Sequence, residues 1–521
     1  MKKKFQYQVN GKTVERQYSY IPFRYILAIL ITLLEVLAII GIVVALCYFV
    51  PYFYIAALLT EIACVVKIVA SDDNPDYKVP WLLVVLVLPI VGFMLYFIFS
   101  SRTLKKKYVK RLKDIKDKSY KKDDSALFAT LKGDDSAAHN QAQMLCKISE
   151  AHLFTDTQQT YFPLGEDMHK SMLVDLEKAE KFIYMEYFII EEGEFWGSIL
   201  EILKRKAAEG VDVKVVYDDI GCMTTLAGNY AKILKTYGIS ATPFSRLKGN
   251  ADSEFNNRSH LKITVIDGLV GYTGGVNIAD EYINRVVRFG HWKDVGLRLE
   301  GEAVWELTKL FLIDYGINVN EPIQENAAHY PNNESVKADG YIVPFGDGPK
   351  PIFERRVGKS VIRALLDNAK DYAYITTPYL IIDNELCTTI ENAALRGVDV
   401  KIVLPHIPDK KIVFGMTRSF YPRLMDAGVE IYEYESGFVH AKNYLVDDEY
   451  AMIGTINLDY RSLVHHFENG VWMYKTACLA DIKKDMLETL NKSIKISKEM
   501  ATPNLWQRAF RSLVRIFAPL L

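Results

Sequence analysis

The sequence predicts an α/β protein in which one α/β unit occurs twice, after N-terminal transmembrane helices. An apolar strand, an amphipathic helix and a second buried strand follow one another from about residue 156, and the same order returns from about residue 369. The stretch Gly210–Lys214 also recurs letter for letter as Gly397–Lys401. Such self-similarity indicates an internal repeat. Strand–helix–strand order favours parallel pairing, so we expect each repeat to form a mostly parallel sheet flanked by helices.

The membrane region is expected to occupy residues 1–100. The stretch from Ile26 to Ala70 is almost continuously apolar. At about 1.5 Å per residue, it is too long for one span of a hydrocarbon core about 30 Å thick. Pro51 offers a break in this stretch, and a second apolar segment follows it. The candidate spans are Ile26–Val50, Tyr52–Val69 and Trp81–Phe99. We therefore expect two or three transmembrane helices in a multi-pass protein of the cell membrane.

Two basic segments bear on the orientation of these spans. Residues 101–122 hold eleven Lys or Arg against two acids, Asp114 and Asp117. Because Lys and Arg accumulate on the cytoplasmic side, the large region that follows should be cytoplasmic. Three spans would then place the N-terminus outside, yet residues 1–24 carry six Lys or Arg. Either the first apolar block is one span plus a re-entrant piece, or the N-terminal basic residues are overruled.

Composition and periodicity give the remaining boundaries. We expect a basic juxtamembrane segment and linker over residues 101–150, the first repeat over 151–320, a joint over 321–340, the second repeat over 341–500 and an amphipathic helix over 501–521. In the first repeat the expected strand, helix and strand are Lys181–Ile190, Trp196–Glu209 and Val211–Tyr217. Their counterparts in the second repeat are Tyr372–Ile381, Leu386–Leu395 and Val398–Leu404.

The C-terminal helix is expected to separate apolar from basic side chains. One side carries Trp506, Phe510, Leu513, Val514 and Phe517, and the other carries Arg508, Arg511 and Arg515. This pattern favours a helix lying in the membrane interface, where arginines meet anionic lipid. The alternative is a helix docked against the large folded region.

A motif of reactive side chains occurs once in each repeat. A histidine and a lysine two residues apart on a strand point to the same face, so the imidazole lies beside a positive charge. A glycine and an asparagine then supply a close backbone turn and an amide, which together suit a bound phosphate. The first copy is His260, Lys262, Asp267, Gly274-Gly275 and Asn277, and the second, 180 positions later at identical intervals, is His440, Lys442, Asp447, Gly454-Thr455 and Asn457.

The duplication has a chemical meaning. Exchange at a phosphodiester requires one group that attacks phosphorus and another that protonates the leaving oxygen on the far side. A single His-x-Lys on a strand could be ordinary surface alternation. The match of every motif residue in two copies argues against chance.

These residues resemble the phospholipase D superfamily, whose mark is this doubled motif. From about Asp73 onward the chain is similar, within that superfamily, to the bacterial cardiolipin synthases. The stretches that carry the narrower resemblance are Asn74-Pro75 with Lys78 and Trp81 before the apolar Pro89/Gly92 segment, Tyr217–Gly221, Gly346–Pro349 and Arg515–Leu521. The resemblance implies two phospholipase D-like repeats related by a pseudo-twofold axis, which would bring His260 and His440 together.

The resemblance also implies roles. His260 would attack phosphorus to give a phosphohistidine, and His440 would act as acid and then base, although the sequence itself is symmetric on this point. The residues expected to bind substrate oxygens are Lys262, Lys442, Asn277, Asn457, Gly275 and Thr455. The motif carboxylates Asp267 and Asp447 are expected to be mainly architectural. The later carboxylates Asp294 and Glu468 are expected to orient the imidazoles.

No metal or other cofactor is expected. The other histidines, including His291, His465 and His466, lack the spacing to carboxylates typical of a metal-binding helix, so we expect them at the surface or in support of the site. The six cysteines are scattered without a C-x-x-C pair, which predicts free buried thiols.

The expected reaction is transfer of a phosphatidyl group from one phosphatidylglycerol to another, with release of glycerol. The expected partners are phosphatidylglycerol and anionic membrane lipid. Water or another alcohol as acceptor is an alternative within the enzyme class, and a catalytically silent membrane scaffold is an alternative outside it. A membrane-tethered nuclease is disfavoured because the net charge is −1. The sequence leaves the oligomeric state open.

Overall fold

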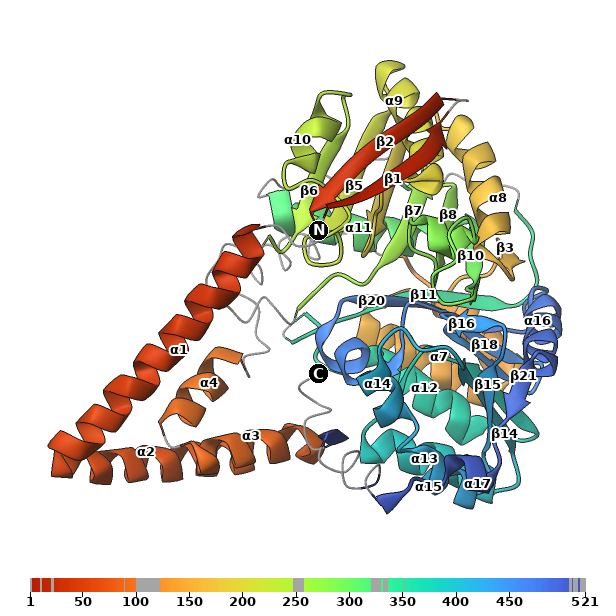
Figure 1. The fold of residues 1–521 in the computed structure, drawn as a ribbon. Coiled ribbons are helices and arrows are strands. Elements are labelled where there is room, and N and C mark those ends of the chain that lie inside the picture. The colour runs from red at the N-terminus through yellow and green to blue at the C-terminus, as the bar shows by residue number, and fades with distance from the viewer. Residues whose placement is uncertain are drawn as a thin grey trace.

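The computed structural model describes residues 2–9, 12–19, 23–88, 90–99, 122–246, 257–319, 329–330, 336–350, 352–505, 508 and 514–515. Two halves, each built around a sheet, lie against one another, and the N-terminal helices extend from them as an arm (Figure 1). The prediction of a mixed α/β fold with two sheet-bearing halves is therefore confirmed.

The first half has a sheet in the order β3-β10-β8-β7-β4-β5-β6. Its strands are β3 (Thr157–Phe162), β4 (Phe182–Tyr187), β5 (Asp212–Asp218), β6 (Ser240–Phe244), β7 (Lys262–Ile266), β8 (Val270–Gly274) and β10 (Gly296–Gly301). Its helices are α8 (Gly165–Glu177), α9 (Glu194–Ala208), α10 (Tyr230–Lys235), the 3₁₀-helix η2 (Asp280–Ile283) and α11 (Val304–Val319).

The second half repeats this plan in the order β11-β20-β18-β17-β12-β14-β15-β21. Its strands are β11 (Tyr341–Asp347), β12 (Tyr372–Thr376), β14 (Asp399–Pro405), β15 (Glu430–Tyr434), β17 (Asn443–Val446), β18 (Tyr450–Gly454), β20 (Glu468–Tyr474) and β21 (Ser493–Lys495). Its helices are α12 (Val357–Asn368), α13 (Asn384–Leu395), α14 (Lys411–Thr417), α15 (Tyr421–Asp426), the π-helix η3 (Arg461–His465), α16 (Leu479–Asn491) and α17 (Lys498–Ala501).

The expectation of mostly parallel sheets is wrong. Only β4-β5-β6 and β12-β14-β15 pair in parallel, and every other neighbouring pair in the two large sheets is antiparallel. The motif segment explains the difference, because only Asp267–Leu269 separates β7 from β8, and so short a connection can join only antiparallel strands. The strand–helix–strand order describes the start of each repeat but not its motif hairpin.

The core runs through both halves. Along β4, Ile183 and Met185 face a cluster with α8 and α9, while Phe182 and Tyr184 face the opposite cluster. This is the alternation that a strand buried on both faces requires. The cluster that contains Phe182 and Tyr184 continues into the sheet of the second half, so this shared core holds the two halves together.

The segment expected to be a linker is instead helical. Helices α6 (Ser125–Asp134) and α7 (Ser136–Ser149) bury Leu131, Ala138, Ala142 and Leu145, and α7 contacts α12 and β11 of the second half. The buried face of α7 also includes the polar residues His139, Gln141 and Ser149, which gives a weak periodic signal in the sequence. Most of the basic run Arg102–Lys122, most of the joint 321–340 and most of the C-terminal helix lie outside the described residues.

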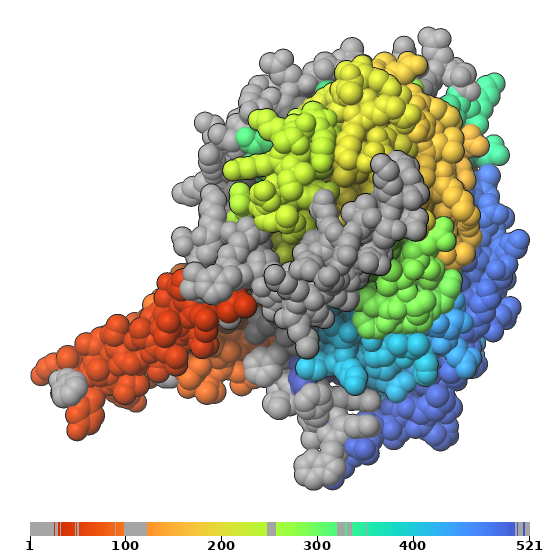
Figure 2. Space-filling model, turned by 45° about the horizontal axis from the view of Figure 1, so that its top comes forward, coloured from red at the N-terminus to blue at the C-terminus, as the bar shows by residue number. Residues whose placement is uncertain are grey.

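The N-terminal region begins with a hairpin that the sequence did not predict, β1 (Lys2–Val9) paired with β2 (Lys12–Ser19), which lies against the first half (Figure 1). Helices α1 (Phe23–Phe49), α2 (Pro51–Ala70), α3 (Pro75–Val87) and α4 (Val91–Phe99) follow. Figure 2 shows α1 projecting from the body. Among the described residues, Tyr52–Ala70 is the one helix long and apolar enough to cross a membrane, with a shorter apolar stretch at Leu33–Leu46. The third candidate span, Trp81–Phe99, is divided between α3 and α4.

Candidate active site

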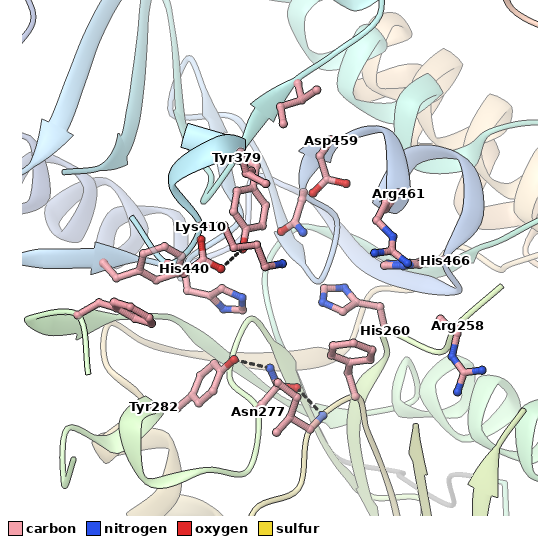
Figure 3. A pocket seen from close by; sticks show the side chains of 18 of the residues that line it. Arg258, His260, Asn277, Tyr282, Tyr379, Lys410, His440, Asp459, Arg461 and His466 are labelled. Atoms are coloured by element: carbon pink, nitrogen blue, oxygen red, sulfur yellow. Dashed lines mark hydrogen bonds between the residues drawn. The ribbon is translucent and has the colours of Figure 1, made fainter. Parts of the chain in front are cut away.

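Two histidines from different halves face each other across a cavity of about 400 Å³ (Figure 3). His260 lies just before β7, and His440 lies just before β17, so each is delivered by the motif hairpin of its own repeat. Both imidazoles line the cavity and are otherwise buried. The structure thus brings the two sequence-predicted histidines into one site.

Each histidine is held by the opposite repeat. The Nδ1 atom of His260 lies 2.8 Å from Oε2 of Glu468, and that of His440 lies 2.6 Å from Oδ2 of Asp294. The backbone pairs in the same crossed way, because the N–H of His260 donates to Phe467 (2.8 Å) and that of His440 donates to Lys293 (2.7 Å). Short parallel pairing of β16 (Gly437–Val439) with β9 (His291–Lys293) continues this crossing. The site is therefore complete only when both repeats are present.

These contacts orient both imidazoles, but the two carboxylates differ in charge. Although burial opposes it, His440 and Lys442 lower the pKa of Asp294, so this ionised carboxylate accepts from Nδ1 of His440 and leaves the lone pair on Nε2. Burial instead raises the pKa of Glu468 well above its usual value. Glu468 also accepts from the hydroxyls of Ser462 (2.7 Å) and Thr455. Burial, reinforced by Lys442, lowers the pKa of His440 to about 4, and burial with Lys262 holds the pKa of His260 well below its usual range. Both imidazoles are neutral bases at neutral pH.

The two motif lysines are fully buried beside the histidines. The Nζ of Lys262 donates to the backbone oxygen of His260 at 2.9 Å, and the Nζ of Lys442 lies 3.0 Å from Nε2 of His440. Burial lowers the pKa of Lys262 to about 7, with Lys442 contributing, and burial lowers the pKa of Lys442 to about 8 against the pull of Asp294. An anion in the cavity would favour the charged form of both amines.

The motif carboxylates Asp267 and Asp447 lie away from the cavity. Asp267 accepts from the backbone N–H groups of Glu180, Lys181 and Phe182 at 2.7–2.8 Å. Asp447 does the same at Lys370, Asp371 and Tyr372 at 2.7–2.9 Å. Both residues sit in tight turns with a φ of 55°. Each carboxylate ties the motif hairpin to the start of a neighbouring strand.

The residues expected to contact substrate divide into two groups. Asn277 and Asn457 line the cavity. Asn277 accepts from the backbone N–H of Ile189 (3.1 Å) and donates to the hydroxyl of Tyr282 (2.7 Å). Gly275 and Thr455 instead lie behind the imidazoles. A Cβ at Gly275 would collide with Oδ1 of Asp294, whereas the Thr455 hydroxyl donates to Glu468.

The two sides of the cavity differ in chemistry. The side at His260 has Phe188, with ring centroids 5.1 Å apart, and Arg461. Arg258 also lines this side, but its guanidinium is held in a buried ion pair with Asp218 at 2.9 Å. The side at His440 has the rings of Tyr282 and Trp292, with centroids 5.4 Å and 5.6 Å from the imidazole. Asp409 and Tyr379 lie on this side too, where the Tyr379 hydroxyl donates to Asp409 at 2.6 Å.

The sequence analysis did not identify most of the cavity residues outside the doubled motif, and it did not expect His466 in the cavity. His466, expected at the surface or in support, lines the cavity with its ring centroid 5.4 Å from that of His260. His465 is buried against Tyr77, and His291 is partly buried beside Tyr434. The position of His466 just after the second motif and before Glu468 was an available signal.

One cluster of potential metal ligands occurs among the described residues. His260, His466 and Glu468 offer ligand atoms within 4.8 Å of one another. The two oxygens of Glu468 already accept from His260, Thr455 and Ser462. The neighbouring ammonium of Lys262 would repel a cation, so this donor set fits an anion better and we assign it no metal.

Comparison with known proteins identifies the family. A family model described as "Cardiolipin synthase, PLD-like domain" matches residues 172–287 and 362–490, and one described as "Phospholipase_D-nuclease N-terminal" matches residues 62–100. The chain is 33% identical over 462 residues to a cardiolipin synthase of Halalkalibacterium halodurans, covering 86% of this chain and 90% of that protein. The chain belongs to the cardiolipin synthase family. It is therefore an enzyme of the phospholipase D superfamily, as its doubled motif predicted.

Other relatives agree with this membership. A cardiolipin synthase of Geobacillus kaustophilus is 33% identical over 456 residues, covering 86% of this chain and 89% of that protein. An uncharacterized protein of Streptococcus mutans is 43% identical over 449 residues, covering 85% and 96%. The crystal structure of a phosphatidylserine synthase of Haemophilus influenzae shares the fold, with a TM-score of 0.56 at 16% identity over 74% of this chain and 98% of that one. Family membership supports phosphatidyltransferase activity, and the match to the N-terminal model with one apolar helix indicates a membrane protein.

Proposed function

We propose that this cardiolipin synthase family member transfers a phosphatidyl group from one phosphatidylglycerol to a second, forming cardiolipin and releasing glycerol. The observation that carries the proposal is the crossed pair of neutral imidazoles, each with Nδ1 on a carboxylate of the other repeat. Two opposed groups of this kind suit an in-line displacement at phosphorus. The phospholipid product is taken from the relatives, which are cardiolipin synthases.

In the first step, Nε2 of His260 attacks phosphorus and the bond to the headgroup glycerol breaks. His440 gives a proton to that glycerol oxygen, so it must enter the step protonated. Its pKa of about 4 in the unliganded site would rise beside the anionic phosphate, because a nearby negative charge favours the protonated form. Lys262 and Lys442 would balance the charge that develops on the non-bridging oxygens.

In the second step, His440 is a neutral base again. It removes the proton from a headgroup hydroxyl of the second phosphatidylglycerol, whose oxygen attacks the phosphohistidine. The P–N bond to His260 breaks, cardiolipin forms and the imidazole returns to its starting state. Glu468 and Asp294 keep both rings aligned and stabilise each imidazole as it becomes positively charged.

The alcohol is assigned to the His440 side of the cavity. Asp409, whose charge acts on Lys442, offers carboxylate oxygens that can accept from glycerol hydroxyls. The His260 side carries Arg461, which suits phosphate rather than a polyol, whereas the guanidinium of Arg258 is already paired with Asp218. This difference supports His260 as the nucleophile and His440 as the acid and base.

The proposed site of action is the cell membrane, with a multi-pass arm and a cytoplasmic catalytic region. The basic run that follows Phe99 supports this orientation and would also hold anionic lipid near the site. The described part of the C-terminal segment touches the catalytic body, because the Arg515 guanidinium lies 4.4 Å from the Phe420 ring centroid. That contact favours docking over the expected interfacial helix at this position.

The test is to incubate the purified full-length protein with labelled phosphatidylglycerol in vesicles and identify the products. Cardiolipin and glycerol in equal amounts are expected. Phosphatidic acid without cardiolipin would instead indicate water as the acceptor, and the absence of any product would favour a silent scaffold. Mass analysis of peptides after quenching without acid should locate a phosphatidyl group on His260, and an adduct only on His440 would reverse the two roles.

A further inference from the structure

The chain between α2 and residue 99 does not have the form of a crossing helix. Helix α3 has 13 residues and α4 has nine. At about 1.5 Å per residue they reach about 20 Å and about 14 Å, short of a hydrocarbon core about 30 Å thick. Between them Ile90 has a φ of 64°, and a Cβ at Gly92 would collide with the carbonyl oxygen of Val84. The chain therefore turns back tightly at this point.

Side-chain contacts show that α4 runs back toward the end of α2, where α3 begins. The rings of Trp81 in α3 and Tyr96 in α4 pack edge to face, with centroids 5.5 Å apart. Near the end of α4, the Phe97 ring centroid lies 4.3 Å from the Nζ of Lys67, which is in the last turn of α2. Lys78 at the start of α3 donates to the backbone oxygen of Val69 at 2.9 Å. The end of α2, the start of α3 and the end of α4 thus lie together.

This common end is attached to the catalytic body. Asn74 donates to Asp383 at 2.7 Å, and the backbone N–H of Asn384 donates to Asp76 at 2.8 Å. The Tyr77 hydroxyl lies 3.3 Å from Nε2 of His465. The partners belong to α13 and to η3, and the residue after η3 is the cavity residue His466. Figure 1 shows α2 directed from the tip of the arm toward this body.

We propose that α3 and α4 form a re-entrant hairpin that enters the bilayer from the catalytic side and leaves on the same side, while α1 and α2 are the two crossing helices. The inference rests on the membrane placement proposed above. Its partner is the acyl-chain layer of one leaflet. The apolar side chains of α3 that remain exposed and suit this layer are Val79, Leu83, Leu86 and Val87.

The hairpin also removes the charge conflict in the sequence. With two crossing helices, the N-terminus and the catalytic body lie on one side. The β1–β2 hairpin contacts α9 of the first repeat, which agrees with this arrangement. The six Lys or Arg of residues 1–24 and the eleven of residues 101–122 then all face the cytoplasm.

The experiment is cysteine labelling of the full-length chain with a membrane-impermeant maleimide, in a background whose native cysteines are replaced by alanine. Asp72→Cys reports the link between α2 and α3, and Leu395→Cys, at a residue 70% exposed on the catalytic body, is the matched control. Both cysteines should be labelled in vesicles of one sidedness and protected in vesicles of the other. Labelling from opposite sides would overturn the hairpin and restore three spans.

The readout is independent of activity, so it separates this inference from the proposed reaction. If the protein shows no phosphatidyl transfer but both cysteines are labelled from the same side, the hairpin is supported and the proposed reaction is not. If alkaline carbonate extracts the chain from membranes and both cysteines react in every preparation, the membrane placement fails, and the hairpin fails with it.

Discussion

The two repeats have the same motif hairpin but differ in what surrounds its histidine. In both, an aspartate ties the hairpin to a neighbouring strand, and a carboxylate from the opposite repeat holds Nδ1. His260 then faces His466 and lies on the side of Arg461, whereas His440 faces Tyr282 and Trp292 and lies on the side of Asp409 and Lys410 (Figure 3). The shared features support chemistry that both histidines perform. The differences support a division of roles that the symmetric sequence motif could not provide.

The two repeats also differ in the residue that packs against the orienting carboxylate. Gly275 leaves room for the short side chain of Asp294, and the matching Thr455 fills that room and donates to the longer Glu468. The first repeat thus has the shorter residue at both positions, and the second repeat has the longer residue at both.

The largest effect should come from the histidines. His260→Ala and His440→Ala should each lower transfer by about 10³-fold or more, and the double variant should lose little beyond either, since the pair acts as a unit. Transfer of labelled phosphatidylglycerol and the melting temperature are the measurements. Near-normal turnover by either folded single variant would contradict a two-histidine mechanism.

Exchanging Gly275 and Thr455, the residues behind the imidazoles, should lower kcat by different amounts in the two repeats. Gly275→Thr should lower kcat by about 100-fold, because the new side chain displaces Asp294 and misaligns His440. Thr455→Gly should cost about tenfold or less, since Glu468 keeps its contacts with Ser462 and His260. Both proteins should melt cooperatively. Equal losses would mean that the two carboxylates are supported in the same way.

The alcohol side should control the product. Asp409→Asn should lower the ratio of cardiolipin to phosphatidic acid by about tenfold, because a hydrogen bond from a hydroxyl to a charged group is lost. Asp426→Asn, at an exposed carboxylate paired with Lys498, should leave the ratio unchanged. A fall in total turnover at an unchanged ratio would remove Asp409 from acceptor binding.

An effect of similar size should appear in the pH dependence of anion binding. Lys262 and Lys442 have pKa values lowered to about 7 and about 8, so they are charged below this range and neutral above it. Sulfate, whose own charge is constant here, should inhibit about tenfold more weakly at pH 9.5 than at pH 6.5. Lys262→Gln should bind sulfate more weakly at pH 6.5 and show a shallower dependence. Inhibition that strengthens with rising pH would contradict this assignment.

Sequence reasoning reached the shared features and missed the different ones. The doubled motif predicted the histidines, and their spacing to later acids led to Asp294 and Glu468. Trp292 and His466 each lie two residues before the orienting carboxylate of their repeat, but the two side chains differ, so no internal match marked them. Asp409 lies between β14 and α14 and had no match either. The antiparallel hairpins were missed because strand–helix–strand order at the start of each repeat was extended to the whole. The turn at Ile90 was missed because apolar composition does not reveal where a helix breaks.

The crossed contacts have a consequence for the origin of the molecule. A single repeat carries a complete motif, yet the carboxylate for its own histidine lies on the other repeat. One copy alone would have an imidazole with no orienting partner, whereas two copies around a twofold axis would complete each other through identical patches. A symmetric dimer of one-repeat chains would thus have had a working site before any fusion. In one chain, the two halves can have different neighbours around each histidine without losing either contact.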